Sequence, residues 1–137
     1  MIFQVNPNNN EPVYTQIENG IRSAILRGVF REGEQLPSRR DLADQLRVNP
    51  NTIAVAYRNL ERDGVAEVRR GLGMFVAGGA AAICRRLRGQ TLAQKFGQLL
   101  GEARQANLSH QQVRDLFEKH LDEAFDPGNA PDSGDDE

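Results

Sequence analysis

The 137-residue sequence predicts a mainly α-helical protein with one small β-hairpin. Apolar residues recur at helical spacing along most of the chain, and two short helical segments are separated by only about three residues. The pattern then changes to two short strand-like segments joined by a turn that contains two glycines. Three helices followed by a hairpin form a winged helix-turn-helix, and we expect two further helices after it.

The first helix is indicated by one apolar face near the N-terminus. Pro12 suits a first helical turn, and Gly28 is a typical C-terminal stop. The expected buried face consists of Tyr14, Ile17, Ile21, Ala24 and Ile25. Because this face continues over about three turns, we expect it to pack into the core.

The next two helices carry clear start signals. Ser38 is a natural N-cap for a short helix over residues 39–46. Asn49 as N-cap, with Pro50 at the first helical position, predicts a helix that runs to about Asp63. Its expected buried face consists of Ile53, Ala56, Tyr57 and Leu60. The short connection between the two helices leaves room only for the tight turn of a helix-turn-helix.

A β-hairpin is expected after the third helix. Residues 65–69 and 74–77 have strand-like patterns, and residues 70–73 join them through Gly71 and Gly73. The pair Gly78-Gly79 marks a boundary, so we assign residues 1–78 to the winged helix-turn-helix domain.

The remaining helices form a second region, over residues 79–125. Gly89 is a candidate kink in its first helix, and Ser109 with Gln112 predicts a capping box at the start of the second. The apolar positions are Leu92, Phe96, Leu99, Leu100, Val113, Leu116, Phe117 and Leu121. These faces are too large for one short helix pair to bury, so the sequence predicts dimerisation through them. Residues 126–137 are rich in Pro, Gly and acidic residues, and we expect a disordered acidic tail.

The net charge of −2 conceals a segregation of charge along the chain. Residues 1–89 hold 13 Arg and no Lys against 9 acidic residues, a balance of +4. Residues 90–137 hold 4 basic residues against 10 acidic residues, a balance of −6. Arginine suits planar, bidentate contact with phosphate or guanine, although a high-GC genome also favours arginine codons.

Composition excludes several classes of protein. There is no apolar run of about 18 residues, so we expect no membrane span, and no basic segment precedes residues 2–5 as in a secretory signal. Cys84 is the only cysteine, which fits the cytoplasm, and its neighbours Arg85 and Arg86 would lower its thiol pKa. Two histidines and one cysteine cannot form a tetrahedral metal site, so we expect no metal and no cofactor.

Three segments together resemble the signature of the GntR family of bacterial transcription regulators. They are GEQLPSRRDLA at residues 33–43, VNPNTI at 48–53 and RGLGMFV at 70–76. The second segment and the short C-terminal region are similar to the YtrA-type subfamily. The resemblance implies a homodimeric repressor with an N-terminal winged helix and a helical dimerisation region. Pro50 and Ala54 depart from other branches of the family, so the base contacts of those branches are not carried over.

Arg39 and Arg40 are candidate phosphate ligands at a helix start. A cation there opposes the helix dipole, at a cost of about 0.3–1 kcal/mol. A DNA phosphate at that position would bind both the free N–H groups and the arginines. The resemblance also places Arg40 at a DNA-contacting position of the family. The alternative is a solvated pair bonded to Glu32, Glu34 or Asp44.

The third helix offers candidates for reading bases. In helix-turn-helix proteins, the N-terminal residues of the recognition helix meet base edges in the major groove. Asn51 is the best candidate, because Asn can form two hydrogen bonds to adenine. Thr52 suits a thymine methyl group or a phosphate, and Arg58 suits a phosphate. Asn49 either caps the helix only or also contacts DNA.

The hairpin turn supplies the last candidates. Gly71 and Gly73 allow the backbone of the turn to approach DNA closely, and Arg70 can reach the DNA backbone or the minor groove. The alternative is a tight hairpin with no contact to DNA. Together, the predicted DNA-binding residues are Ser38, Arg39, Arg40, Asn49, Asn51, Thr52, Arg58, Arg70, Gly71 and Gly73.

These observations predict a sequence-specific DNA-binding transcription regulator, acting as a homodimeric repressor on a pseudo-palindromic operator. A winged-helix adaptor that binds a protein instead of DNA is the alternative, which the acidic C-terminal third keeps open. The expected partners are double-stranded DNA and a second copy of the chain, and a small-molecule effector of unknown identity is an open alternative. We find no nucleophile elbow, phosphate-binding loop or metal-ligand spacing, so the sequence predicts no enzyme activity.

Overall fold

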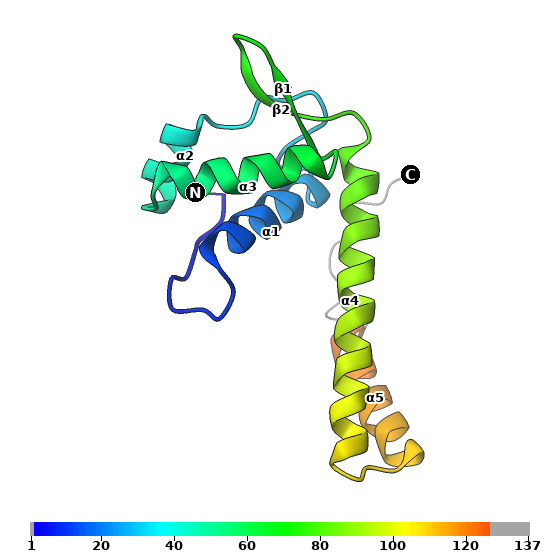
Figure 1. Ribbon diagram of the computed structural model, residues 1–137. Coiled ribbons are helices and arrows are strands. Elements are labelled where there is room, and N and C mark those ends of the chain that lie inside the picture. The colour runs from blue at the N-terminus through cyan, green and yellow to red at the C-terminus, as the bar shows by residue number, and fades with distance from the viewer. Residues whose placement is uncertain (1, 127–137) are drawn as a thin grey trace. The chain divides into compact units, whose positions relative to one another are not determined.

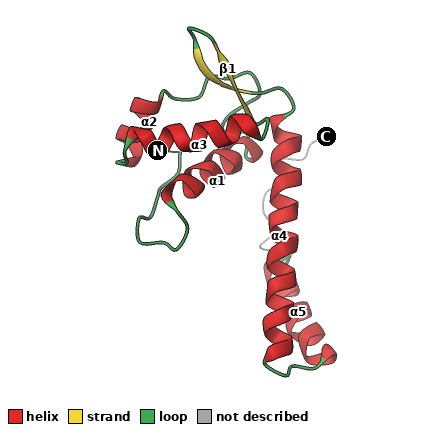
Figure 2. Cartoon of the chain, viewed as in Figure 1, coloured by secondary structure: helices red, strands yellow, loops and turns green. Residues whose placement is uncertain are grey.

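The computed structural model describes residues 2–126, which form two compact units: the first ends at Gln90 and the second begins at Thr91 (Figure 1). The helices are α1 (Val13–Leu26), α2 (Arg39–Leu46), α3 (Pro50–Arg62), α4 (Ala80–Gln105) and α5 (His110–Ala124), and the strands are β1 (Ala66–Arg69) and β2 (Gly73–Val76). Figure 2 shows the helices and the hairpin formed by β1 and β2. The mainly α fold with a small β-hairpin is confirmed. Apart from Asp126, the expected acidic tail lies outside the described residues.

The core of the first unit is formed by the buried faces of α1, α2 and α3 with the hairpin and the start of α4. Ile17, Ile21 and Ile53 are almost completely buried, as the spacing predicts. The expectation for Tyr14 is wrong, because its side chain is 39% exposed. Val13 packs against the core instead, since it continues the i, i+4 series that leads to Ile17 and Ile21.

An N-terminal arm, residues 2–5, packs onto this core, and the sequence patterns did not indicate it. Ile2, Phe3 and Val5 are partly buried against the core cluster. Phe3 lies over Gly20 so closely that a Cβ at Gly20 would be 2.5 Å from the ring. Glycine in the middle of α1 therefore provides the space that the aromatic ring occupies.

A single glutamine side chain anchors the loop that follows the arm. Gln16 Oε1 accepts a hydrogen bond from the backbone N–H of Asn6, and Gln16 Nε2 donates to the Asn6 carbonyl, both at 2.8 Å. The same Nε2 donates to the Glu11 carbonyl at 3.0 Å. The Gln16 amide thus pairs with the backbone as a neighbouring strand would.

The helix-turn-helix is capped as the sequence predicts. Ser38 Oγ accepts a hydrogen bond from the N–H of Asp41 at 3.0 Å, and Asn49 Oδ1 accepts one from the N–H of Asn51 at 2.8 Å. Arg47 ends α2 in the left-handed conformation, with φ of 58°, and so reverses the chain toward α3.

The hairpin is part of a slightly larger sheet than expected. β1 and β2 pair antiparallel, with Glu67 opposite Phe75. The observed strand limits, 66–69 and 73–76, differ from the expected limits by at most one residue. Residues 33–36 run along the other edge of β2, where Gln35 forms a bridge with Phe75. Backbone hydrogen bonds of 2.8 Å join Gly33 and Glu34 to Val76, and Leu36 to Met74. This third segment ties the approach to α2 directly to the hairpin.

A polar network joins α1 to α3 beside the apolar core. The Glu18 carboxylate is buried and accepts a hydrogen bond from the Asn59 amide at 2.8 Å. Arg22 donates to Asp63 at 2.9 Å and to Glu18 at 3.4 Å. The bonds to Asn59 and Asp63 restrict the rotation of α3 against α1, because both require a particular side of α3, while the bond between Arg22 and Glu18 lies within α1.

The second unit pairs the C-terminal part of α4 with α5. Phe96 and Phe117 meet edge to face, with ring centroids 6.0 Å apart. Ser109 and Gln112 form the predicted capping box. α4 continues as a helix through Gly89, the candidate kink. Within residues 2–126, every helix is too short or too polar to cross a lipid bilayer.

Candidate nucleic-acid interface

Helix α3 presents a stripe of mostly polar side chains away from the core, which we call the α3 stripe: Asn51, Val55, Arg58 and Arg62. Asn51 and Arg58 are exposed, and neither side chain has a hydrogen-bond or ion-pair partner within residues 2–126. Arg62 lies 3.5 Å from Asp63. Thr52 is half-buried beside the stripe, and its N–H donates to the Asn49 carbonyl.

The opposite face of α3 is occupied by structural contacts. Leu60 is fully buried, and the Tyr57 hydroxyl donates to the Pro37 carbonyl at 2.6 Å. This bond links α3 to the residue just before the Ser38 cap. The position of the α2 start is therefore fixed relative to the α3 stripe.

Arg39 and Arg40 are exposed in the first turn of α2. The expected alternative paired them with Glu32, Glu34 or Asp44. Within the described part of the chain, neither guanidinium makes such an ion pair. Both side chains therefore stand at the positive end of the helix dipole without an ion-pair partner, with Asp41 as the acidic residue of the same turn.

The hairpin separates its two arginines into different roles. Arg69 stacks over the Phe75 ring, 4.2 Å from its centroid, and also lies 3.1 Å from the Glu67 carboxylate. Arg70 has no such contact within residues 2–126 and is exposed. Arg69 thus stabilises the hairpin, while Arg70 is free to contact a ligand.

The wing turn, residues 70–73, requires its glycines. Gly71 has φ of 79° and Gly73 has φ of 117°, which side chains with a Cβ rarely adopt. Leu72 between them is 64% exposed. The exposed leucine and the two glycines allow residues 71–73 to approach a surface closely, next to the charge of Arg70.

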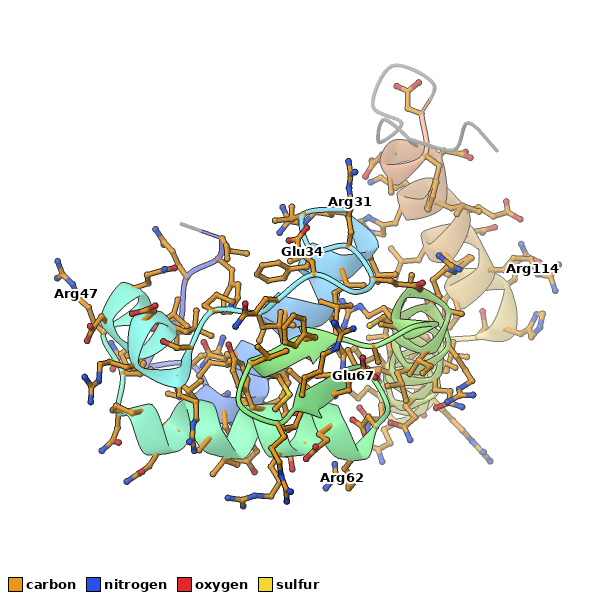
Figure 3. All side chains as sticks on the ribbon, turned by 90° about the horizontal axis from the view of Figure 1, so that it is seen from above. Arg31, Glu34, Arg47, Arg62, Glu67 and Arg114 are labelled. Atoms are coloured by element: carbon orange, nitrogen blue, oxygen red, sulfur yellow. The ribbon has the colours of Figure 1, made fainter. Side chains whose placement is uncertain are left out.

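The three groups of candidates are arranged along one helix. Figure 1 shows α2 beside the N-terminal end of α3 and the hairpin near its C-terminal half. In Figure 3, Arg62 of the α3 stripe and Arg31 of the loop after α1 point to opposite sides of the first unit. The side of the first unit toward which Arg62 points is therefore different from the side that bears Arg31.

The buried titratable groups offer no reactive site. Burial raises the pKa of the Cys84 thiol, although Arg22 and Arg85 act in the opposite direction. The expected lowering by neighbouring arginines is therefore wrong, because Cys84 is completely buried. Burial also raises the pKa of Tyr57 well above its usual range. Within residues 2–126, no group of three or more His, Cys, Asp and Glu residues could hold a metal ion.

Comparison with known proteins gives consistent results. Residues 13–76 match the family model described as bacterial regulatory proteins, gntR family. The chain is 30% identical over 118 residues to the HTH-type transcriptional repressor YtrA of Bacillus subtilis, covering 86% of this chain and 91% of that protein.

Two solved structures extend the comparison. A GntR family transcriptional regulator from Listeria monocytogenes superposes with a TM-score of 0.69 at 27% identity, covering 82% of this chain and 97% of that one. The DNA-binding domain of AraR, solved in complex with operator ORX1, superposes with a TM-score of 0.51 at 28% identity, covering 56% of this chain and 96% of that domain.

Proposed function

Because this chain belongs to the GntR family of bacterial regulatory proteins, we propose that it is a homodimeric repressor that binds a pseudo-palindromic operator in the cytoplasm. The chain is a DNA-binding transcriptional regulator, and its relatives are regulators rather than enzymes. This family membership also disfavours the alternative of a protein-binding adaptor. The name of the Bacillus subtilis relative supports repression rather than activation.

One observation supports the DNA-binding face most strongly. Exposed arginines and an asparagine without internal partners occur at the start of α2, along the α3 stripe and at the wing turn. Neighbouring polar side chains of the same unit, such as Arg22 and Arg69, are engaged in ion pairs. Unpartnered arginines also occur elsewhere in the unit, at Arg27 and Arg31, so the position of the candidates on the helix-turn-helix and the wing of a regulator of this family is what points to a polyanionic ligand.

Each candidate has a proposed role. Arg39 and Arg40 bind a phosphate together with the N–H groups that follow the Ser38 cap. Asn51 reads an adenine edge in the major groove, with Thr52 beside it. Arg58 contacts a phosphate, and Asn49 caps α3 and also contacts the DNA. At the wing, Arg70 contacts the DNA, and Gly71 and Gly73 allow the close approach of the turn.

We assign residues 1–78 to DNA binding and residues 79–125 to dimerisation. The apolar side chains of the second unit support this, because Phe96 is 50% exposed and Leu99 is 61% exposed even though α4 and α5 are paired. The complete set is Leu92, Phe96, Leu99, Leu100, Val113, Leu116, Phe117 and Leu121. A second copy of the chain would bury these side chains and double the number of base contacts.

The operator experiment uses DNA selected from random duplexes by the full-length protein. We expect a sequence with two-fold symmetry whose half-sites are about one helical turn, or a multiple, apart. Affinity for the selected duplex, measured by fluorescence anisotropy, should fall steeply as salt rises. Failure to select any sequence, or selection of an asymmetric single site, would contradict the proposal.

The dimer experiment compares two double variants by sedimentation velocity. Leu99→Glu/Leu100→Glu places two charges on the exposed apolar face and should produce a folded monomer with weakened operator binding. Lys95→Glu/Gln98→Glu places two acidic residues at exposed polar positions of the same helix and should leave the dimer intact. A dimer that survives the leucine substitutions would show that the subunits meet elsewhere.

A further inference from the structure

Gln35 reaches from outside the hairpin to the tip of the wing. Its backbone lies on the segment that pairs with β2, opposite Phe75. Its side-chain Nε2 donates a hydrogen bond to the Leu72 carbonyl at 2.6 Å. Leu72 is the third residue of the wing turn, so this bond attaches the turn to a segment that belongs to the approach to α2.

The turn is shaped to admit this side chain. A Cβ at position 73 would lie 2.9 Å from Gln35 Nε2, which is closer than real Cβ contacts. Glycine at position 73 therefore has two roles: it allows the positive φ of the turn, and it leaves space for the Gln35 amide. Two features of the turn therefore accommodate the Gln35 amide: the Leu72 carbonyl accepts its hydrogen bond, and Gly73 has no Cβ that would collide with it.

We propose that Gln35 is a positioning residue for DNA binding, which holds the wing turn so that Arg70 is presented to the DNA. The inference rests on the proposed contact between the wing and DNA. Arg69, Phe75 and Glu67 fix the strand side of the hairpin, while Gln35 fixes the turn itself.

The expected effect is on binding rather than on folding. Gln35 is exposed and its hydrogen bond competes with water, so the loss of this one bond should not unfold the unit. A turn that is free to move must be ordered when DNA binds, and that ordering weakens affinity. Loss of the hydrogen bond between Gln35 and the Leu72 carbonyl should therefore leave the fold intact and reduce operator binding.

The test substitutes Gln35→Leu, which retains the size of the side chain and removes the donor. Affinity for the selected duplex should fall by about three- to tenfold, the factor that corresponds to one hydrogen bond. The thermal midpoint should stay within about 3 °C of the wild-type value. Gln4→Leu, at another exposed glutamine of the same unit, is the matched control and should change neither quantity.

A double-mutant cycle with Arg70→Ala separates positioning from a general structural role. If Gln35 acts through Arg70, Gln35→Leu should have little further effect on affinity in the Arg70→Ala background. In the free protein, ¹⁵N relaxation should show increased motion of residues 71–73 in the Gln35→Leu variant alone.

The outcomes distinguish the inference from the function on which it rests. Weaker binding by Arg70→Ala with unchanged binding by Gln35→Leu would overturn the positioning role alone. Equal losses from Gln35→Leu in both backgrounds would also overturn it, because the effect would not pass through Arg70. Unchanged binding by Arg70→Ala would overturn the wing contact and, with it, the inference.

Discussion

Replacing Arg39 and Arg40 by alanine should make the free protein more stable while strongly weakening operator binding. Both cations stand in the first turn of α2 without an ion-pair partner in the described residues. Each opposes the helix dipole by about 0.3–1 kcal/mol, and solvent screening at exposed sites favours the lower end. The double substitution should therefore raise the unfolding free energy by about 0.5–1 kcal/mol. For a unit of this size, that corresponds to a rise of about 2–8 °C in the thermal midpoint.

The same variant should lose a large part of its affinity for DNA. A hydrogen bond to a charged group contributes about 1.5–3 kcal/mol, so two lost phosphate contacts should weaken each half-site by at least about 100-fold. The slope of log affinity against log salt should flatten by about 0.9 for each lost contact, or about 2 for each half-site.

The assay combines thermal melts of the free protein with anisotropy titrations at several salt concentrations. Arg27→Ala/Arg31→Ala removes the same charge from the first unit, outside the helix-turn-helix, and serves as the control. The control should leave the salt slope nearly unchanged. A double variant at Arg39 and Arg40 that melts earlier and still binds the operator would refute the phosphate assignment, because that pattern belongs to a structural ion pair.

Three further predictions concern the packing around the site. Gly20→Ala should destabilise the protein because the new Cβ meets the Phe3 ring, yet in a Phe3→Ala background it should stabilise by up to about 1 kcal/mol through helix propensity; thermal melts that give equal effects in both backgrounds would exclude the docked arm. Tyr57→Phe should lower the unfolding free energy by about 1–2 kcal/mol in urea titrations, because the Pro37 carbonyl loses its partner; an unchanged value would contradict this. Burial raises the pKa of the Cys84 thiol, so the stability that it confers is present below the unfolded-state pKa of about 8.5 and is lost as pH rises through the folded-state pKa. At pH 8 the thiol should therefore react with a disulfide reagent far more slowly in the folded protein than in denaturant, and equal rates would show that it is accessible.

Local signals predicted the elements that local contacts determine. The caps at Ser38, Asn49 and Ser109 were identified from residues within three positions of each helix start, and all three caps are present. The buried faces of α1 and α3 follow from spacing alone, apart from the first turn of α1. The turn glycines located the hairpin to within one residue.

The contacts that join distant segments were not predictable from spacing. Phe3 and Gly20 meet across the N-terminal arm, and neither belongs to a periodic pattern that indicates the other. Gln35 bonds to Leu72, 37 positions away, through a single side chain. Such contacts depend on the tertiary arrangement of the segments, which a one-dimensional pattern does not contain.

The candidate site was predicted as a set of residues but not as a division of roles. The sequence gives no reason why Arg69 should be engaged by Phe75 while its neighbour Arg70 stays free. That distinction arises from the alternation of side chains across the hairpin, which places Arg69 on the same face as Phe75 and Glu67. The roles of the α2 and α3 residues toward DNA remain predictions.

The two faces of α3 differ in how freely they can change over evolutionary time. Ile53 and Leu60 pack in the core, and Asn59 and Asp63 are bonded to α1. The side chains of Asn51 and Arg58 make no such contacts within the described residues. Substitutions at exposed positions of this kind usually alter stability by less than about 0.5 kcal/mol. Duplicated copies of this gene could therefore diverge in operator preference one mutation at a time, and every intermediate along the way would still be a folded protein.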